Sequence, residues 1–168
     1  MRAYVLTHVS DTVLIRDLDS FIGQERTALA SVLAHIAEVD ARQLYLPTGF
    51  PSMFEYCVGK LRLSEQAAMK RIRAGRTARR FPAIFDALAE GRLHLSAVIL
   101  LTRHLTADNA DDLLAAAAYR TRAEIEQLLA LRFPEPDVAT RIDAIAPPLL
   151  LTSATDQLSP GTVESDAD

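Results

Sequence analysis

The chain has 168 residues, of which 49% are hydrophobic, and its formal net charge is −4 at pH 7. This length suits about one domain with a real core, and no apolar stretch approaches the ~20 residues that a membrane span needs. The single cysteine excludes an internal disulfide and the first residues have too short an apolar run for a secretory signal, so we expect a cytoplasmic protein without a membrane partner.

The first predicted element is a long helix over residues 18–45, because apolar side chains recur there close to the 3.6-residue helical period. These residues are Leu18, Ile22, Leu29, Val32, Leu33, Ile36 and Val39. Asp17 and Asp19 favour its start through the helix dipole, and Pro47 stops it. We expect residues 1–16 to form an N-terminal extension.

A helix, a short turn and a second helix are predicted next. Ser52-x-x-Glu55 is a capping box that opens a helix over residues 53–61. Ser64 can cap the following helix, which runs to Phe81. This is the layout of a helix-turn-helix, whose second helix enters the major groove of DNA by its N-terminal part.

Two more helices are expected beyond this unit. Pro82 suits the first turn of a short helix over residues 83–90, which Gly91 ends. Ser96 is expected to cap a helix over residues 97–104.

The last two predicted helices precede a change in composition. Thr106 is expected to cap a helix over residues 107–119. Thr121-x-x-Glu124 is a second capping box, and it starts a helix that runs to about residue 133.

These patterns predict an all-α fold, because no segment shows the alternation of a strand and Leu and Ala supply most of the apolar residues. The compact multi-helix domain should cover residues 17–133. Five of the eight prolines, followed by Ser, Thr and Asp, lie in residues 134–168. We expect this segment to be a linker or tail that is largely disordered.

Charge is distributed very unevenly along the chain. Eight of its 18 basic residues fall within residues 60–80, where Glu65 is the only acid. They are Lys60, Arg62, Lys70, Arg71, Arg73, Arg76, Arg79 and Arg80. This segment carries a net charge of +7 and the rest of the chain −11. Such a local basic element in an acidic chain indicates a surface that faces a polyanion.

The second helix of the predicted unit has an apolar and a cationic face. The apolar face, which should pack inward, consists of Ala68, Met69, Ile72 and Gly75. The expected contacts with phosphates are Lys70, Arg73, Arg76 and Arg80, with Lys60 and Arg62 in support. An alternative remains open, in which the helix is solvated and its arginines pair with acids elsewhere in the chain.

No pattern predicts catalysis, a metal site or a cofactor. Cys57 fits a small buried core residue better than a reactive thiol. The four histidines lie outside any zinc-binding motif, and the acidic groups at helix starts complement helix dipoles. The chain also lacks a Gly-rich phosphate loop and a nucleophile with an evident base. We therefore expect no catalytic residue, no metal ligand and no cofactor.

Several segments carry a resemblance to a known family. They are LAHIAEVDAR (33–42), LYLPTGF (44–50), SMFEYC (52–57), LSEQAA (63–68), KRI (70–72), ARRFP (78–82), LAEGRLHLS (88–96) and NADDLL (109–114). Together, over about residues 8–138, they resemble the helical region that precedes the nuclease module in a family of bacterial HNH endonuclease-type proteins. Members of that family look like DNA-acting proteins with an all-helical front half and a C-terminal HNH module.

The resemblance implies a DNA-associated domain, most simply one that binds double-stranded DNA. The HNH module of the family uses a histidine general base and a metal held by His, Asp or Asn. This sequence reaches Asp168 before any HNH motif, so His94 and His104 inherit no catalytic role. We expect a chain that is not an enzyme as it stands, whether it is a truncated gene product, a fragment or a stand-alone relative.

A second function fits the same sequence. The chain could be a protein-interaction or dimerisation module without direct DNA contact, in which the long N-terminal helix pairs with another copy. Its arginines would then be solvated or would bind an acidic partner.

Overall fold

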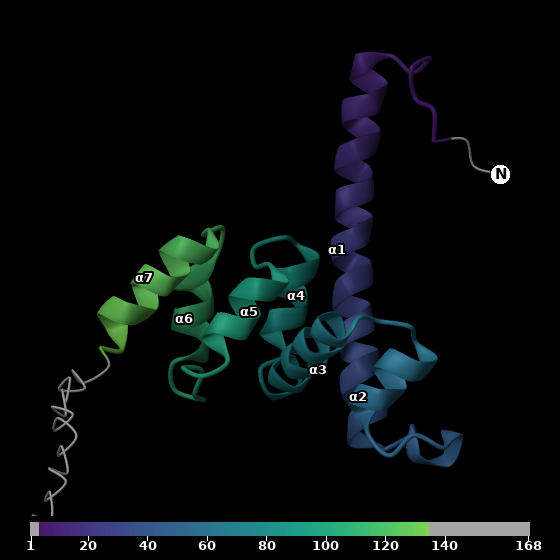
Figure 1. Cartoon of the computed structure of the whole chain (residues 1–168). Coiled ribbons are helices and arrows are strands. Elements are labelled where there is room, and N and C mark those ends of the chain that lie inside the picture. Colours follow the sequence, from purple (N-terminus) through teal and green to yellow (C-terminus); the bar gives the residue numbers. More distant parts are fainter. Residues whose placement is uncertain (1–3, 135–168) are drawn as a thin grey trace, which may run out of the picture. The chain divides into compact units, whose positions relative to one another are not determined.

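The computed structural model describes residues 4–134, and every regular element among them is helical (Figure 1). In chain order they are α1 (Asp11–Ala41), the 3-10 helix η1 (Leu46–Thr48), α2 (Met53–Glu55), the π-helix η2 (Tyr56–Lys60), α3 (Glu65–Arg80), α4 (Ala83–Ala89), α5 (Leu95–Leu101), α6 (Ala110–Ala117) and α7 (Arg122–Arg132). The predicted all-α fold with a long first helix is confirmed for this part of the chain. The predicted disordered tail lies outside the described residues, apart from Pro134.

The first helix begins earlier than predicted. α1 starts at Asp11, after Ser10 in extended backbone, so residues 11–16 of the expected N-terminal extension are helical. It ends at Ala41, which is earlier than the predicted Tyr45. Asp11 lies in the first turn and complements the helix dipole, the role that the sequence suggested for Asp17. None of the helices in residues 4–134 combines the length and the apolar character that crossing a membrane requires.

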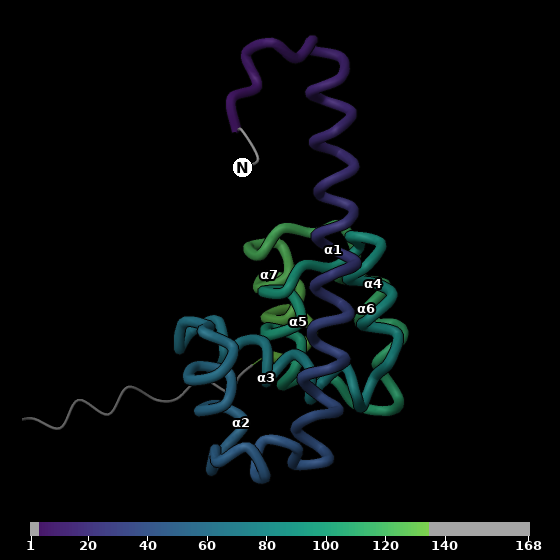
Figure 2. Tube along the Cα trace, turned by 90° about the vertical axis from the view of Figure 1, so that its right-hand side faces the viewer, coloured from purple at the N-terminus to yellow at the C-terminus, as the bar shows by residue number. Residues whose placement is uncertain are grey.

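α1 contributes to the core through its second half alone. Its buried residues are Ala30, Leu33, Ile36 and Ala37. Figures 1 and 2 show that this half lies against α3 and α4, whereas the first half extends beyond the other helices. The first half of α1 is therefore held by its own backbone hydrogen bonds, without a helix packed against it in the described structure.

Buried apolar side chains form two clusters. The larger one joins α1 to α3–α7, and its fully buried members include Leu33, Ile84, Leu101, Leu113 and Ile125. The smaller one lies under α2, η2 and α3 and consists of Ile36, Tyr45, Met53, Cys57, Ala68 and Ile72. Cys57 is fully buried, as predicted, and this burial raises the pKa of its thiol.

The crossing of α3 over α1 depends on a glycine. A Cβ atom on Gly75 would lie 2.9 Å from the carbonyl oxygen of Leu33 and 3.5 Å from the Cβ of Ala37. Because glycine lacks this atom, the two helix backbones approach closely. This contact places α3 on the buried face of α1 and fixes the position of the cationic residues that α3 carries.

The four helices predicted after α3 are all present, but two of them begin at other residues than predicted. α4 and α7 lie where they were predicted, and Thr121 and Glu124 form a complete capping box. The predicted cap Ser96 is wrong, because α5 begins at Leu95 and its N-cap is His94.

The predicted cap Thr106 is also wrong. α6 begins at Ala110, and its N-cap residue is Asn109. The side chain of Asn109 accepts a hydrogen bond from the backbone N–H of Thr106 at 2.9 Å and donates one to the carbonyl of His104, also at 2.9 Å. These bonds hold residues 106–109 in a turn instead of a first helical turn.

Candidate nucleic-acid interface

The predicted helix-turn-helix-like unit is present. The hydroxyl of Ser52 accepts a hydrogen bond from the backbone N–H of Glu55 at 3.1 Å, and helical backbone continues from Met53 to Lys60 through α2 and η2. Arg62, in the turn that follows, adopts a left-handed backbone conformation with φ 58°. The hydroxyl of Ser64 then accepts from the N–H of Ala67 at 3.3 Å and caps α3.

The inward face of α3 contains three of the four residues predicted for it. Ala68, Ile72 and Gly75 are buried. Met69 was expected among them, but 63% of it is exposed. It lies about 100° around the helix from Ala68, and there it borders the open side of α3, where no other helix of the described chain covers it.

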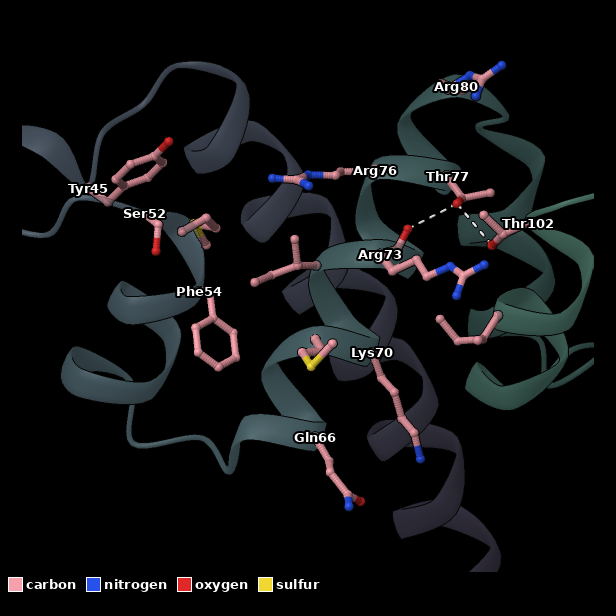
Figure 3. A pocket seen from close by; sticks show the side chains of 14 residues that line it. Tyr45, Ser52, Phe54, Gln66, Lys70, Arg73, Arg76, Thr77, Arg80 and Thr102 are labelled. Carbon is pink, nitrogen blue, oxygen red and sulfur yellow. Dashed lines mark hydrogen bonds between the residues drawn. The ribbon is translucent and has the colours of Figure 1, made fainter. Parts of the chain in front are cut away.

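The cationic face of α3 lines a groove between α2 and α5 (Figure 3). This groove has a volume of about 950 Å³. Its four cationic residues are those predicted on α3, namely Lys70, Arg73, Arg76 and Arg80. None of the residues that line it is acidic. We call these four residues, with the space that they border, the cationic groove.

The floor of the cationic groove is largely apolar, which the sequence did not indicate. Met53 and Phe54 come from α2, Met69 and Ile72 from α3, and Ile99 from α5. Where α3 meets α5, the hydroxyls of Thr77 and Thr102 lie 3.1 Å apart, as Figure 3 shows. The helical period places Gln66, Met69 and Lys70 on one side of α3, but the walls come from residues distant in sequence. The sequence therefore carried no direct signal for this floor.

Two of the arginines of α3 pair with carboxylates at the end of α1. Arg76 donates from Nε to Oδ2 of Asp40 at 2.6 Å and from Nη2 to Oδ1 at 3.2 Å. The hydrogen bond with Asp40 raises the pKa of Arg76. Nη2 of Arg79 lies 3.7 Å from a carboxylate oxygen of Glu38. The alternative prediction, pairing with acids elsewhere in the chain, thus holds for these two residues.

The other three cations of the groove have different surroundings. Within the described residues, Lys70, Arg73 and Arg80 form no ion pair. The guanidinium carbon of Arg80 lies 5.4 Å from the ring centre of Phe81, a distance at which a cation is attracted to an aromatic face. These three side chains are the cations that a bound anion could reach without displacing a carboxylate of the described chain.

The remaining predicted contacts, Lys60 and Arg62, do not line the groove. Lys60 is the last residue of η2 and Arg62 lies in the turn before α3, and both are exposed. Arg71 is half-buried and donates to the carbonyl of Ala67 at 3.4 Å. The structure therefore gathers four of the six predicted residues in one groove and places the other two at the turn of the same unit.

His94 and His104, which the resemblance gives no catalytic role, have structural contacts. The ring Nδ1 of His94 accepts a hydrogen bond from the backbone N–H of Ala97 at 3.1 Å, which caps α5. The ring of His104 stacks on that of Phe133, with their centres 4.7 Å apart. Across residues 4–134, no three side chains of His, Cys, Asp or Glu come together as a metal-binding group.

Comparisons of the chain with models of protein families, with curated proteins and with solved structures found no match. What can be inferred about function therefore depends on the charges and the geometry of the residues described above.

Proposed function

We propose that this chain contains a DNA-associated helical domain of the HNH endonuclease type, which binds double-stranded DNA through the cationic groove and does not cut it. The observation that carries the proposal is the set of four cations along one groove whose lining contains no acid. Lys60 and Arg62, at the turn of the same unit, would extend the contact toward the N-terminus of α3. The proposal includes a cytoplasmic location, where such a domain meets DNA.

The physical basis is the attraction between this groove and the phosphate backbone. Arginine presents a planar fork of donors that matches phosphate oxygens, and lysine adds a point charge. Each phosphate that is neutralised releases condensed counterions, so log K falls with log salt concentration with a slope of about 0.9 per contact. Lys70, Arg73 and Arg80 are expected to contribute most, because Arg76 is already paired with Asp40.

The resemblance to HNH endonuclease-type proteins supports the same partner. The resemblance covers the helical region, and the 168 residues contain no HNH motif. The proposed role is therefore binding alone. Metal-dependent nicking of a plasmid by the purified chain would contradict the non-catalytic part of the proposal.

A fluorescence anisotropy titration with a labelled duplex at several salt concentrations tests the DNA contact. We expect affinity to fall steeply as salt rises, and Arg73→Gln with Arg80→Gln to reduce the slope by about 0.9 for each lost contact. Arg122→Gln is the matched control, because Arg122 lies on α7 and pairs there with Glu126. Unchanged affinity after charge removal at Arg73, Arg76 and Arg80 would overturn the proposal.

The competing function is a protein-interaction or dimerisation module without DNA contact. The observation in its favour is that Arg76 and Arg79 are paired with Asp40 and Glu38, as in a solvated helix whose charges are balanced within the fold. A chain that shows no affinity for duplex DNA even at low salt, and that forms a salt-resistant oligomer in light scattering, would favour this function.

A further inference from the structure

The cationic groove offers an apolar surface that contact with phosphates alone does not use. Phe54 of α2 and Ile99 of α5 are half-buried in its lining, and Met69 of α3 is 63% exposed. Lys70 and Arg73 line the same opening (Figure 3). Surfaces that bind single strands combine cations for the backbone with apolar, aromatic side chains for the bases. A ligand that fills the groove should therefore carry apolar faces as well as negative charge.

We propose that the cationic groove binds unpaired nucleotides of a DNA strand, with the phosphates at its cations and the bases against its apolar floor. This inference rests on the proposed function and specifies the form of DNA that the groove takes. In a regular duplex both faces of each base are stacked on neighbouring bases, so a protein reaches only the backbone and the base edges in the grooves. An unpaired base has free faces, which aromatic and apolar side chains bind with little regard to sequence.

The row of cations along α3 has a suitable length for one strand. Lys70 and Arg80 are ten residues apart, or about 15 Å along the helix axis. A strand in B-form advances about 3.4 Å per nucleotide, so the row spans about four nucleotides, or fewer if the strand is extended. Among the described residues, neither these two cations nor Arg73 between them forms an ion pair. Phosphates of one strand can therefore bind all three without displacing a carboxylate of the described chain.

The lining also contains groups that suit a base itself. Of the two aromatic residues in this lining, Tyr45 is buried and Phe54 is half-buried, so Phe54 supplies the ring on which a base can stack. Figure 3 shows this ring on the α2 side of the groove, and Gln66 and Lys70 on the α3 side. Gln66 is exposed, and its amide has both donors and an acceptor for the edge of a base. The groove thus combines a ring for stacking, a polar group for base edges and cations for phosphates.

Anisotropy titrations of the full chain with two labelled duplexes of the same length test this inference. One duplex is fully paired, and the other contains an internal loop of about four dT·dT mismatches, the length that the cations span. Both carry the same number of phosphates, so their electrostatic attraction to the groove is matched. We expect the loop to bind about tenfold more tightly, because mismatched bases leave the stack at low cost and stack again on the protein. The ratio of the two affinities should stay constant as salt rises, since base stacking releases no counterions.

Two substitutions and an abasic probe separate base contact from backbone contact. Phe54→Leu keeps an apolar side chain but removes the ring, and Met69→Ala shortens an exposed side chain, so circular dichroism should show both variants folded. Each should lower affinity for the mismatched loop severalfold more than affinity for the paired duplex. Leu131→Ala is the matched control and should keep the full preference, because Leu131 is 77% exposed on α7 and does not line the groove. A loop of abasic nucleotides, which is flexible but has no bases, should bind like the paired duplex.

The outcomes distinguish this inference from the proposed function on which it rests. Equal affinity for the paired duplex and the mismatched loop would overturn the inference and leave the proposed function standing. Equal affinity for the abasic and the mismatched loop would also overturn it, because flexibility of the strand would then explain the preference. So would a full preference for the loop in both Phe54→Leu and Met69→Ala. A chain that binds neither DNA would remove the proposed function as well, and the apolar floor would then fit a protein partner.

Discussion

Gly75 occupies the point where α3 crosses α1, and its substitution tests how tightly the two helices are packed. Gly75→Ala should destabilise the protein by about 1 kcal/mol. Overpacking against the carbonyl of Leu33 costs about 1–3 kcal/mol, and the helix propensity of alanine returns only about 1 kcal/mol. The free energy of unfolding in urea is the quantity to measure.

Gly23→Ala is the control for this substitution. Gly23 also lies within a helix, in its case α1, but a Cβ atom there would meet nothing within 4 Å. Alanine should therefore stabilise the protein by about 0.5–1 kcal/mol at this site. If Gly75→Ala were as stabilising as Gly23→Ala, the close approach of α3 to α1 would be contradicted.

The pair Arg76–Asp40 leads to a second prediction at the scale of single residues. Asp40→Asn removes the carboxylate that neutralises Arg76 and leaves this arginine available to an anion in the groove. We expect a severalfold rise in affinity for duplex DNA and a salt slope that increases by up to about 0.9, the value of one phosphate contact. Anisotropy titrations of the two proteins side by side measure both changes.

Glu126→Gln is the control, because it removes one negative charge at a residue that does not line the groove. Glu126 lies on α7, where it pairs with Arg122. A general effect of net charge would raise DNA affinity equally in both variants. If Asp40→Asn bound DNA no better than Glu126→Gln, the groove at Arg76 would not be the contact surface.

At the scale of helices, substitutions of Ser64 and Ser96 compare a serine that caps a helix with one that does not. Ser64→Ala should lower the free energy of unfolding by about 1 kcal/mol, because it removes the hydrogen bond to the N–H of Ala67. Ser96→Ala should change it by less than about 0.5 kcal/mol, since His94 caps α5 instead. Thermal and urea unfolding of the two variants would show the difference. Equal losses would contradict the start of α5 at Leu95.

Local signals predicted those helix ends that local side chains determine. The capping box of Thr121 and Glu124 and the cap at Ser64 depend on residues three positions apart, so the sequence contains the whole interaction. His94 caps α5 in a less usual way, through a ring nitrogen. Asn109 stands at the N-cap position of α6 without a capping hydrogen bond, because its side chain bonds to the preceding turn instead. The start of α1 was missed because two aspartates inside the helix resembled its first turn.

The candidate interface could be predicted in its charges but not in its shape. Helical period alone brought Lys70, Arg73 and Arg80 to one side of α3. The pairing of Arg76 with Asp40 joins residues 36 positions apart and depends on how α3 crosses α1. The apolar floor likewise requires α2 and α5 to stand on either side of α3, which only the tertiary fold determines.

For the whole molecule, the separation of positive from negative charge along the chain bears more on polyanion binding than the net charge does. Residues 60–80 carry +7 while the rest of the chain carries −11. Four of the eight cations of this segment line a single groove whose lining contains no acidic residue. The fold therefore gathers half of the basic residues of this segment on one face of α3, although the protein as a whole is acidic.

This local concentration of positive charge in an acidic chain has a kinetic consequence. At a separation of about one Debye length, which is about 8 Å at physiological salt, a polyanion meets the net negative charge of the chain on most of its surface. Attraction begins only when the groove faces it. Added salt screens the distant repulsion and the close attraction together, so the association rate should change little with ionic strength. Salt should act mainly on the lifetime of the complex, unlike in a uniformly basic protein, whose capture by DNA is accelerated from a distance.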